Sequence, residues 1–209
     1  MSDAERRTHL IDVAERVFLR RGFHAATMDD ISRQAGMSKK TVYQVFSAKA
    51  ALFEALLTDR CSVFTVLIED DERPPKAVLT DVLRRAVVHT LTERQVAIVR
   101  LLIAEAPRSP GIVGALESLD TGGSKDALAK WLAAKTVEGS LTVSDPNETA
   151  TTLFWTAAGD FLMQALLSDS HTPSMTTIEM RVDRVVSAFF REMGTKRRRP
   201  IDSAHKPDG

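Results

Sequence analysis

The sequence predicts an all-α protein with two folded domains and about nine helices. Apolar residues recur at the three-to-four-residue spacing of amphipathic helices, and all eight prolines fall where a helix would begin, end or be absent. No segment shows the alternation of apolar and polar residues that a half-buried strand would give. With 209 residues, 44% of them hydrophobic, the chain is long enough to bury a core without disulfides.

Capping residues and glycines mark where the first two helices begin and end. The apolar stripe of residues 10–18 indicates a first helix, which Gly22 ends. The sequence Thr27-Met28-Asp29-Asp30 resembles a capping box, with Asp30 in the position usually held by Glu or Gln, and it begins a second helix. Gly36 ends this second helix.

The segment from Ser38 to Phe46 is the most informative in the chain. Ser38 can accept hydrogen bonds from the first turn, which predicts an N-cap, and Val42 and Phe46 share one face that can be buried. The opposite face carries a row of hydrogen-bond donors, two of them cationic: Lys39, Lys40, Thr41, Tyr43 and Gln44. A surface that meets both phosphates and base edges needs this mixture.

Two short helices joined by a glycine turn, the second with a donor-rich face, are typical of a helix-turn-helix that binds DNA. The alternative is an ordinary corner between two core helices, and the row of donors favours DNA. Residues 1–60 carry a net charge of +2, residues 61–193 carry −5 and residues 194–209 carry +3. We therefore expect attraction to phosphates to be local and to weaken as salt rises.

Residues 8–54 resemble the DNA-binding domain of the TetR/AcrR family of bacterial transcriptional regulators. The residues that carry the resemblance are Ala14, Phe18, Gly22, Phe23, Thr27, Ile31, Ala35, Gly36, Ser38, Lys39, Thr41, Tyr43, Phe46, Ser47, Lys49, Leu52 and Phe53. Two positions depart from the family's pattern. Ala50 replaces a frequent Glu and removes a capping partner for Ser47, which we expect to begin the next helix. Val45 stands where an aromatic residue or His is common, which can alter base preference.

The expected DNA contacts follow from residue type and from this resemblance. Lys39, Lys40, Thr41 and Gln44 are expected nearest the bases, and Thr27, Ser38, Tyr43 and Lys49 on the phosphate backbone. Thr27 and Lys49 lie at helix N-termini, where free N–H groups attract phosphate. The alternatives are a solvated surface charge for Lys49 and a half-buried core ring for Tyr43.

Six further helices are predicted after the helix-turn-helix. They cover about residues 48–71, 76–91, 93–106, 125–138, 146–167 and 174–193, with a possible short turn of helix around residues 113–119. The first of them is long enough to run from the DNA-binding domain into the second domain. Gly194 is expected to end the last one.

Residues 76–168 more loosely resemble the C-terminal domain of the AefR-like branch of the same family. The matching residues are Arg100 to Arg108, Gly139, Leu141 and Asp145-Pro146. The resemblance implies an all-helical domain that dimerises and holds an effector. We expect residues 1–52 to form the helix-turn-helix domain, residues 53–194 the dimerisation and effector domain, and residues 195–209 a disordered basic tail.

The last two predicted helices carry apolar arcs wider than one neighbouring helix covers, which predicts a homodimer. The expected interface residues are Phe154, Ala158, Phe161, Leu162, Val182, Val185 and Phe189. The alternative is that both helices belong to the core of one chain. A two-fold dimer would place its recognition helices about 34 Å apart, one turn of DNA, and would bind a palindromic operator.

The resemblance also implies an effector pocket in the second domain. Candidates to line it, with His89 and Arg100 as its polar groups, are Phe64, Leu67, Leu101, Trp131, Trp155 and Phe161. For each of these residues the alternative is ordinary core packing.

No motif indicates an enzyme. The five histidines lack the spacing of metal ligands, and Gly122-Gly123-Ser124-Lys125 lacks the first glycine and the preceding strand of a phosphate loop. We therefore expect no catalytic residue, no metal and no cofactor. The polar N-terminus, the absence of a long apolar run and the single cysteine favour a cytoplasmic protein with no membrane partner.

Together these features predict a ligand-responsive, sequence-specific transcriptional regulator, most simply a repressor that a small apolar effector releases from its operator. Two alternatives stay open. One is an activator of the same family, and the other is a ligand-binding or scaffolding helical protein whose helix-turn-helix is idle.

Overall fold

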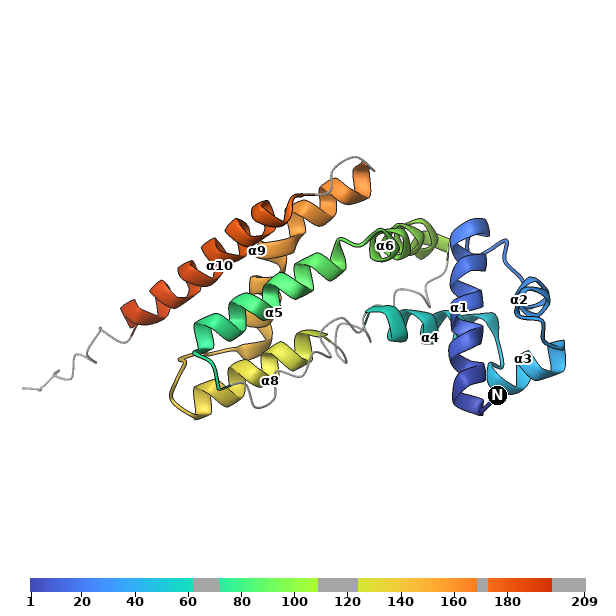
Figure 1. Ribbon diagram of the computed structural model, residues 1–209, viewed down its shortest axis with the longest axis horizontal. Coiled ribbons are helices and arrows are strands. Elements are labelled where there is room, and N and C mark those ends of the chain that lie inside the picture. Colours follow the sequence, from blue (N-terminus) through green and yellow to red (C-terminus); the bar gives the residue numbers. More distant parts are fainter. Residues whose placement is uncertain (62–71, 109–123, 169–172, 197–209) are drawn as a thin grey trace, which may run out of the picture.

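The computed structural model is an elongated, all-helical molecule (Figure 1), and it describes residues 1–61, 72–108, 124–168 and 173–196. Within these ranges the chain forms nine α-helices, one short 3-10 helix and no strand, so the predicted all-α fold is confirmed. The elements are α1 (Asp3–Arg21), α2 (Met28–Ala35), α3 (Lys39–Val45), α4 (Lys49–Cys61), α5 (Pro75–Thr90), α6 (Glu93–Glu105), η1 (Ala106–Arg108), α8 (Ser124–Val137), α9 (Pro146–Leu167) and α10 (Met175–Lys196).

Two predicted helix ends are wrong. Gly194 lies inside α10, which continues to Lys196, because one glycine in a helix costs only about 1 kcal/mol relative to alanine. Helix α4 begins at Lys49, so Ser47 stands two residues before it rather than next to it. The far part of the predicted long helix, residues 62–71, and the predicted turn around 113–119 lie outside the described residues, as does the tail from residue 197.

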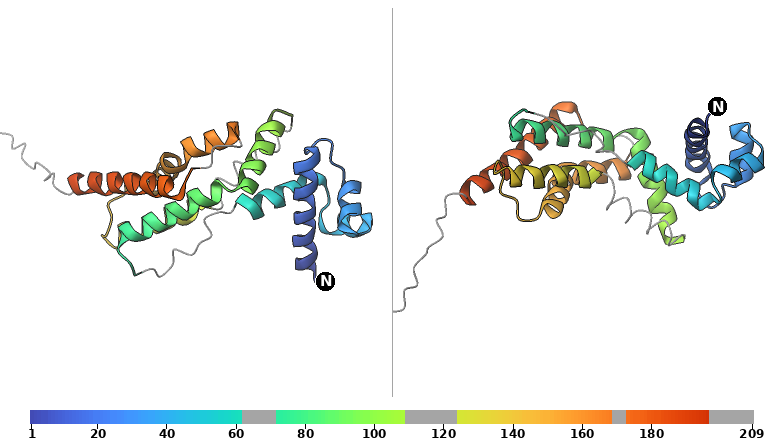
Figure 2. Two further views of the ribbon diagram at one scale, coloured as in Figure 1. Left: turned by 45° about the horizontal axis from the view of Figure 1, so that its top comes forward. Right: turned by 90° about the horizontal axis from the view of Figure 1, so that it is seen from below.

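The buried apolar side chains form two separate clusters, one at each end of the molecule. The N-terminal cluster takes its residues from α1 to α4 and centres on Phe18, Phe23 and Phe53, whose ring centroids lie 4.7 to 5.5 Å apart. The C-terminal cluster is formed mainly by α5, α8, α9 and α10. Figure 2 shows from two further sides that α1 to α3 lie beyond one end of the bundle that these four helices form.

Helix α6 belongs to both clusters. Its residues Ile98, Leu101 and Leu102 are buried in the N-terminal cluster, whereas Val96 is buried in the C-terminal cluster. Helix α6 also binds the C-terminal domain through Arg100, whose guanidinium donates to the carbonyl oxygens of Ala165 and Leu166 in the last turn of α9, at 2.6 and 3.1 Å. The helix-turn-helix domain is therefore completed by a helix that lies some forty residues further along the chain.

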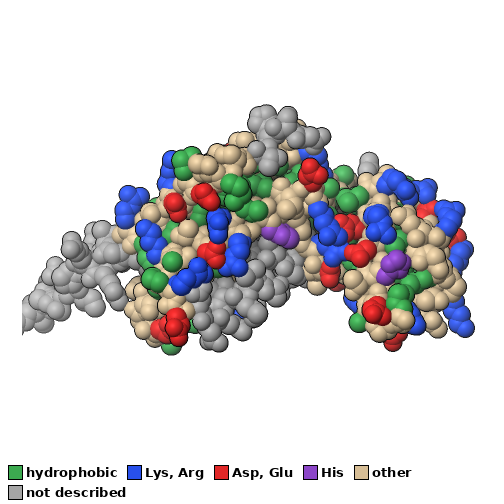
Figure 3. Space-filling view, viewed as in Figure 1, with side chains coloured by type: hydrophobic (Ala, Val, Ile, Leu, Met, Phe, Trp, Pro, Cys, Tyr) green, Lys and Arg blue, Asp and Glu red, His purple; other side chains and the backbone are tan. Residues whose placement is uncertain are grey.

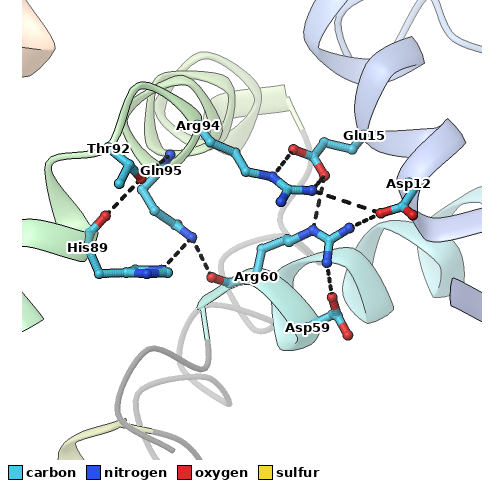
Figure 4. Close-up of polar contacts among 8 residues, drawn as sticks. All are labelled: Asp12, Glu15, Asp59, Arg60, His89, Thr92, Arg94 and Gln95. Atoms are coloured by element: carbon cyan, nitrogen blue, oxygen red, sulfur yellow. Dashed lines mark hydrogen bonds and ion pairs between the residues drawn. The ribbon is translucent and has the colours of Figure 1, made fainter. Parts of the chain in front are cut away.

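A buried carboxylate fastens α6 and α4 to α1 (Figure 4). Glu15 of α1, 6% exposed, accepts two hydrogen bonds of 2.5 Å from Arg94 of α6 and one of 3.0 Å from Arg60 of α4. Arg60 also pairs with Asp12 and Asp59. Burial raises the pKa of Glu15, but the hydrogen bonds from the two arginines outweigh burial and hold the pKa below its ordinary value of 4.5.

A second polar contact secures the end of α4. The side-chain amide of Gln95, in the first turn of α6, donates to the Arg60 carbonyl oxygen at 2.6 Å, and its nitrogen lies 2.9 Å from Nε2 of His89. The first turn of α6 therefore binds α1 through the Glu15 side chain and α4 through the Arg60 carbonyl oxygen.

The Glu15 contacts predict a pH-dependent contribution to stability. Replacing Glu15 with Gln removes the charge that both arginines bind, and should lower the free energy of unfolding at pH 7 by about 1–3 kcal/mol. Because the folded-state pKa lies below 4.5, this contribution is present above pH 4.5 and is lost as the pH falls through the folded-state value. Urea unfolding of both proteins across this pH range measures the difference. A difference that is the same at every pH would show that packing, not charge, is responsible. Glu93→Gln, at an exposed position of α6, is the control.

Candidate DNA-binding surface

The turn between α2 and α3 has the local geometry that its sequence predicts. Thr27 Oγ1 accepts from the Asp30 N–H at 3.1 Å, and the Asp30 carboxylate accepts from the Thr27 N–H at 3.1 Å, so the capping box is confirmed. Gly36 ends α2 in the left-handed conformation, at φ 65° and ψ 26°, where a side chain would introduce strain. Ser38 then caps α3 by accepting from the Thr41 N–H at 3.1 Å.

One face of α3 is anchored in the N-terminal cluster. Val42 is completely buried and Phe46, the residue after α3, is nearly so. The Arg7 guanidinium of α1 lies over the Phe46 ring, 4.6 Å from its centre. These contacts fix the rotation of α3 about its axis and thereby decide which of its side chains are exposed.

The opposite face of α3 is exposed at the outer end of the molecule. Lys39, Lys40 and Gln44 are exposed, and the Tyr43 side chain is 49% exposed. Thr41 is half-buried, and its hydroxyl lies 2.8 Å from that of Ser38. In Figure 3, Lys and Arg side chains gather at the end that α1 to α3 form, with Asp and Glu among them. The predicted donor row thus lies on one accessible surface.

The cations of this surface differ in whether they are paired. Lys39 Nζ lies 2.5 Å from the Asp29 carboxylate of α2, and both side chains are exposed. An exposed pair of this kind is worth at most about 1 kcal/mol, so a phosphate could displace Asp29 from Lys39. Lys40 makes no ion pair with any described residue, so its charge is the one on α3 that is available without rearrangement. The pairing of Lys39 with Asp29 was not predicted, because the two residues lie ten positions apart on different helices.

Lys49 is a correction to the predicted contact set. Its ammonium group points back into the domain and donates to the carbonyl oxygens of Phe23, His24 and Ala26 at 2.6, 3.2 and 2.8 Å, and it lies 4.4 Å from the centre of the Phe23 ring. Burial lowers the pKa of Lys49, opposed by the charge of Glu105. All three ammonium hydrogens have partners within the protein, so the structure supports neither a phosphate contact nor a freely solvated charge.

The predicted effector residues do not come together at one site. Trp131 and Phe161 are buried in the C-terminal cluster, Leu101 is buried in the N-terminal cluster, and Trp155 is 48% exposed. His89 and Arg100 are engaged with Gln95 and with the end of α9, as described above. Phe64 and Leu67 lie outside the described residues. The correction for Leu101 has a simple cause: α6 has two apolar faces, and periodicity alone does not show which domain each face meets.

Most of the predicted dimer residues lie inside a single chain. Five of them are buried in the C-terminal cluster of their own subunit: Ala158, Phe161, Leu162, Val182 and Val185. The other two, Phe154 and Phe189, are half-buried against the same cluster. The apolar arcs of α9 and α10 are largely covered by α5, α8 and each other, so the five buried residues are not available to a second subunit.

Comparison with known proteins agrees with this geometry. Residues 10–56 match the family described as "Bacterial regulatory proteins, tetR family", and residues 77–194 match the "AefR-like transcriptional repressor, C-terminal domain". The second match alone covers more than half of the chain. The chain belongs to the TetR family. Both resemblances found in the sequence are therefore confirmed, and the family is one of DNA-binding transcriptional regulators rather than enzymes.

Curated relatives share mainly the first domain. The chain is 51% identical over 53 residues to the transcriptional activator FasR of Mycolicibacterium smegmatis, covering 25% of this chain and 24% of FasR. It is 42% identical over 53 residues to the transcriptional regulator TtgR of Pseudomonas putida, covering 25% of each chain. The matched segments thus span about a quarter of these relatives.

Two solved structures are similar to this chain over about nine-tenths of its length. A TetR-family regulator from Mesorhizobium loti aligns with a TM-score of 0.77 at 25% identity, covering 92% of this chain and 98% of its own. The flavonoid-responsive regulator FrrA aligns with a TM-score of 0.69 at 27% identity, covering 90% of this chain and 97% of its own. In the part of the chain that the structure describes, no helix has both the length and the apolar character to cross a membrane.

The Lys49 contacts predict a structural role for this side chain. Replacing Lys49 with Met keeps the length of the side chain but removes the donor to three carbonyl oxygens, and should lower the free energy of unfolding by about 1–3 kcal/mol. Thermal or urea unfolding measures this loss. Lys40→Met, at an exposed position of the same domain, should leave stability within about 0.5 kcal/mol of the original. Equal stability of the Lys49 variant and the parent would contradict the role.

Proposed function

We propose that this protein is a sequence-specific DNA-binding regulator of transcription, and that α3 is its recognition helix. The observation that carries the proposal is the division of α3 into two faces. Val42 and Phe46 anchor one face, while Lys40, Tyr43 and Gln44 extend from the other at the outer end of the molecule. Lysine and glutamine side chains of this reach are suited to guanine and adenine edges in the major groove.

Neighbouring groups complete the proposed DNA surface. Ser38, Lys39, Lys40 and Thr41 lie at the start of α3 and are proposed to donate to phosphate oxygens through their hydroxyl and ammonium groups. Thr27, at the N-cap of α2, is exposed and is proposed to contact the phosphate backbone beside them.

We propose residues 1–52 as the DNA-binding unit and residues 53–194 as the dimerisation and effector unit. Helix α6, although it belongs to the second unit in sequence, completes the core of the first. The protein is proposed to act in the cytoplasm, where its DNA target is accessible.

Repression is the favoured direction of regulation. The match over residues 77–194 is to the C-terminal domain of an AefR-like repressor, and it covers the larger part of the chain. Activation is the second candidate, because FasR, named an activator, is 51% identical over the first domain. The match to the repressor domain covers more than half of this chain and the match to FasR covers a quarter of it, so the first is given more weight.

We propose that the protein is a homodimer that binds a palindromic operator through its two recognition helices, about 34 Å apart. The outer face of α9 carries the exposed apolar side chains Trp155 and Met163, with the half-exposed Gly159 between them. Trp155 packs edge-on against Phe154 at a centroid distance of 5.3 Å, which holds the indole in place. An exposed, fixed tryptophan beside a glycine is suited to the centre of a two-fold interface.

The proposed effector is a small, largely apolar molecule held by the C-terminal domain. FrrA, which this chain matches over nine-tenths of its length, is described as flavonoid-responsive, so flavonoids are a first class to examine. Binding would change the separation of the two recognition helices, and a 100-fold loss of operator affinity requires about 2.7 kcal/mol of coupling. A compound that leaves operator affinity unchanged at saturation is excluded as the effector.

Selection of the purified protein against a random duplex DNA library tests DNA recognition. We expect an enriched palindrome whose half-sites lie about 10 base pairs apart. Lys40→Ala should then weaken operator binding and reduce the salt slope of log affinity by about one, because Lys40 is the unpaired cation of α3 among described residues. Lys76→Ala, which removes an exposed cation from α5, is the matched control and should change neither quantity. Salt-sensitive retention with no enriched motif would favour the alternative of a ligand-binding or scaffolding protein with an idle helix-turn-helix.

Replacement of Trp155 with Glu tests the dimer surface. The variant places two carboxylates near the two-fold axis and should dissociate the dimer, as measured by light scattering or sedimentation at micromolar concentration. Val137→Glu changes an even more exposed apolar residue, on α8, and should leave the dimer intact. A Trp155→Glu protein that stays fully dimeric would place the interface elsewhere.

A further inference from the structure

Helix α6 is attached to the helix-turn-helix domain at both of its ends. At its start, Arg94 binds the Glu15 carboxylate of α1, as described above. At its end, Oε1 of Glu105 accepts a hydrogen bond of 3.1 Å from the Phe23 N–H, in the connection between α1 and α2. Between these two contacts, Ile98 and Leu102 are buried in the N-terminal cluster. Any displacement of α6 is therefore transmitted to the helix-turn-helix domain.

Glu105 is buried without being fully hydrogen-bonded. The residue is 5% exposed, and its Oε2 atom has no hydrogen-bond partner among the described residues. Nε2 of His24 lies 3.8 Å from Oε2, which is beyond hydrogen-bond distance, and the charges of Glu105 and Lys49 attract each other. A carboxylate oxygen in this position is costly, because it has lost its hydration without gaining a hydrogen bond. A buried carboxylate adds nothing to solubility. Its hydrogen bond to the α1–α2 connection is the contact that accounts for Glu105 at this position.

The α1–α2 connection, residues 22–26, is held from two sides. Glu105 of α6 binds its Phe23 N–H, and Lys49 of α4 binds three of its carbonyl oxygens. At Gly22, where φ is +77°, an added Cβ atom would lie 3.0 Å from Oε1 of Glu105. The connection leads directly to Thr27, the N-cap of α2, so its position sets where α2 begins.

The other side of α6 is attached to the C-terminal domain. Arg100, one helical turn and a residue before Glu105, donates to the carbonyl oxygens of Ala165 and Leu166 at the end of α9. Two side chains of α6, five residues apart, thus bind the end of α9 and the α1–α2 connection.

We propose that Glu105 is a positioning residue for DNA recognition: its hydrogen bond to the Phe23 N–H holds the α1–α2 connection, and with it the capped start of α2, where DNA binding requires them. The proposal rests on the proposed DNA-binding function, and Glu105 acts through the placement of α2 and α3 without touching DNA. A shift of α6 that moves Glu105 displaces the Phe23 N–H and with it the capped start of α2. Helix α3 follows, since only the short turn at Gly36 to Ser38 separates it from α2.

The test compares Glu105→Ala and Glu105→Gln with Glu93→Gln, an exposed carboxylate at the other end of the same helix. Two quantities are measured at a temperature where all proteins are folded by circular dichroism. One is the ratio of affinities for the selected operator and for an unrelated duplex. The other is amide hydrogen exchange of residues 22–34. We expect Glu105→Ala to lower operator affinity about tenfold and the unrelated duplex by less than twofold, with faster exchange confined to residues 22–34. Glu105→Gln, which keeps the acceptor for Phe23, should fall between Glu105→Ala and the parent, and Glu93→Gln should match the parent.

The outcomes separate this proposal from the broader one. An affinity ratio within twofold of the parent for Glu105→Ala overturns the role of Glu105 even if the protein is a DNA-binding regulator. If the parent selects no operator, the proposed function fails and exchange alone decides the contact: faster exchange confined to residues 22–34 supports it. Exchange that is unchanged, or that increases equally over α1 and α4, overturns it.

Discussion

The arrangement of the two domains depends on the Glu15 carboxylate and on the arginines that bind it. Taking one carboxylate out of water is unfavourable unless well-placed partners satisfy it, and here the partners come from two helices that are distant in the sequence. Arg60 comes from α4 and Arg94 from α6, so the charge of Glu15 is compensated only when both helices are in place. The ion pairs do not supply most of the stability, which comes from apolar burial. They make one relative position of α1, α4 and α6 much more favourable than its neighbours.

This constraint explains why the DNA-binding unit is larger than its sequence motif. The apolar face of α6 fills a part of the N-terminal cluster that α1 to α4 leave open, and the polar contacts at its two ends fix its register there. The domain that recognises DNA therefore has no core entirely of its own. A displacement of α6 would therefore disturb the packing of the helix-turn-helix.

The sequence predicted the local structure well, and it failed where the answer depended on distant partners. Caps and turns are encoded within a few residues, so the ends of α2 and α3 could be predicted from Thr27, Gly36 and Ser38. Periodicity shows that a helix face is apolar but not which neighbour covers it. Leu101 was therefore assigned to the wrong domain, and Val182 to an interface rather than a core. The phosphate contact predicted for Lys49 failed for the same reason, because the carbonyl oxygens that accept from its ammonium group lie 23 to 26 residues earlier in the sequence.

The pairing of charges on the DNA-binding unit has a consequence for recognition. Asp30 accepts ion pairs from Arg21 and Arg33, Asp29 pairs with Lys39, and Lys49 is turned inward. Ion pairs within this surface weaken its attraction to the phosphate backbone, and this attraction supplies most of the affinity for DNA of arbitrary sequence. If α3 is the recognition helix, as proposed, contacts from Lys40, Tyr43 and Gln44 contribute a larger share of operator affinity. The acidic residues among the cations thus favour discrimination between sequences over tight binding to all of them, which suits a regulator that must find one site among many.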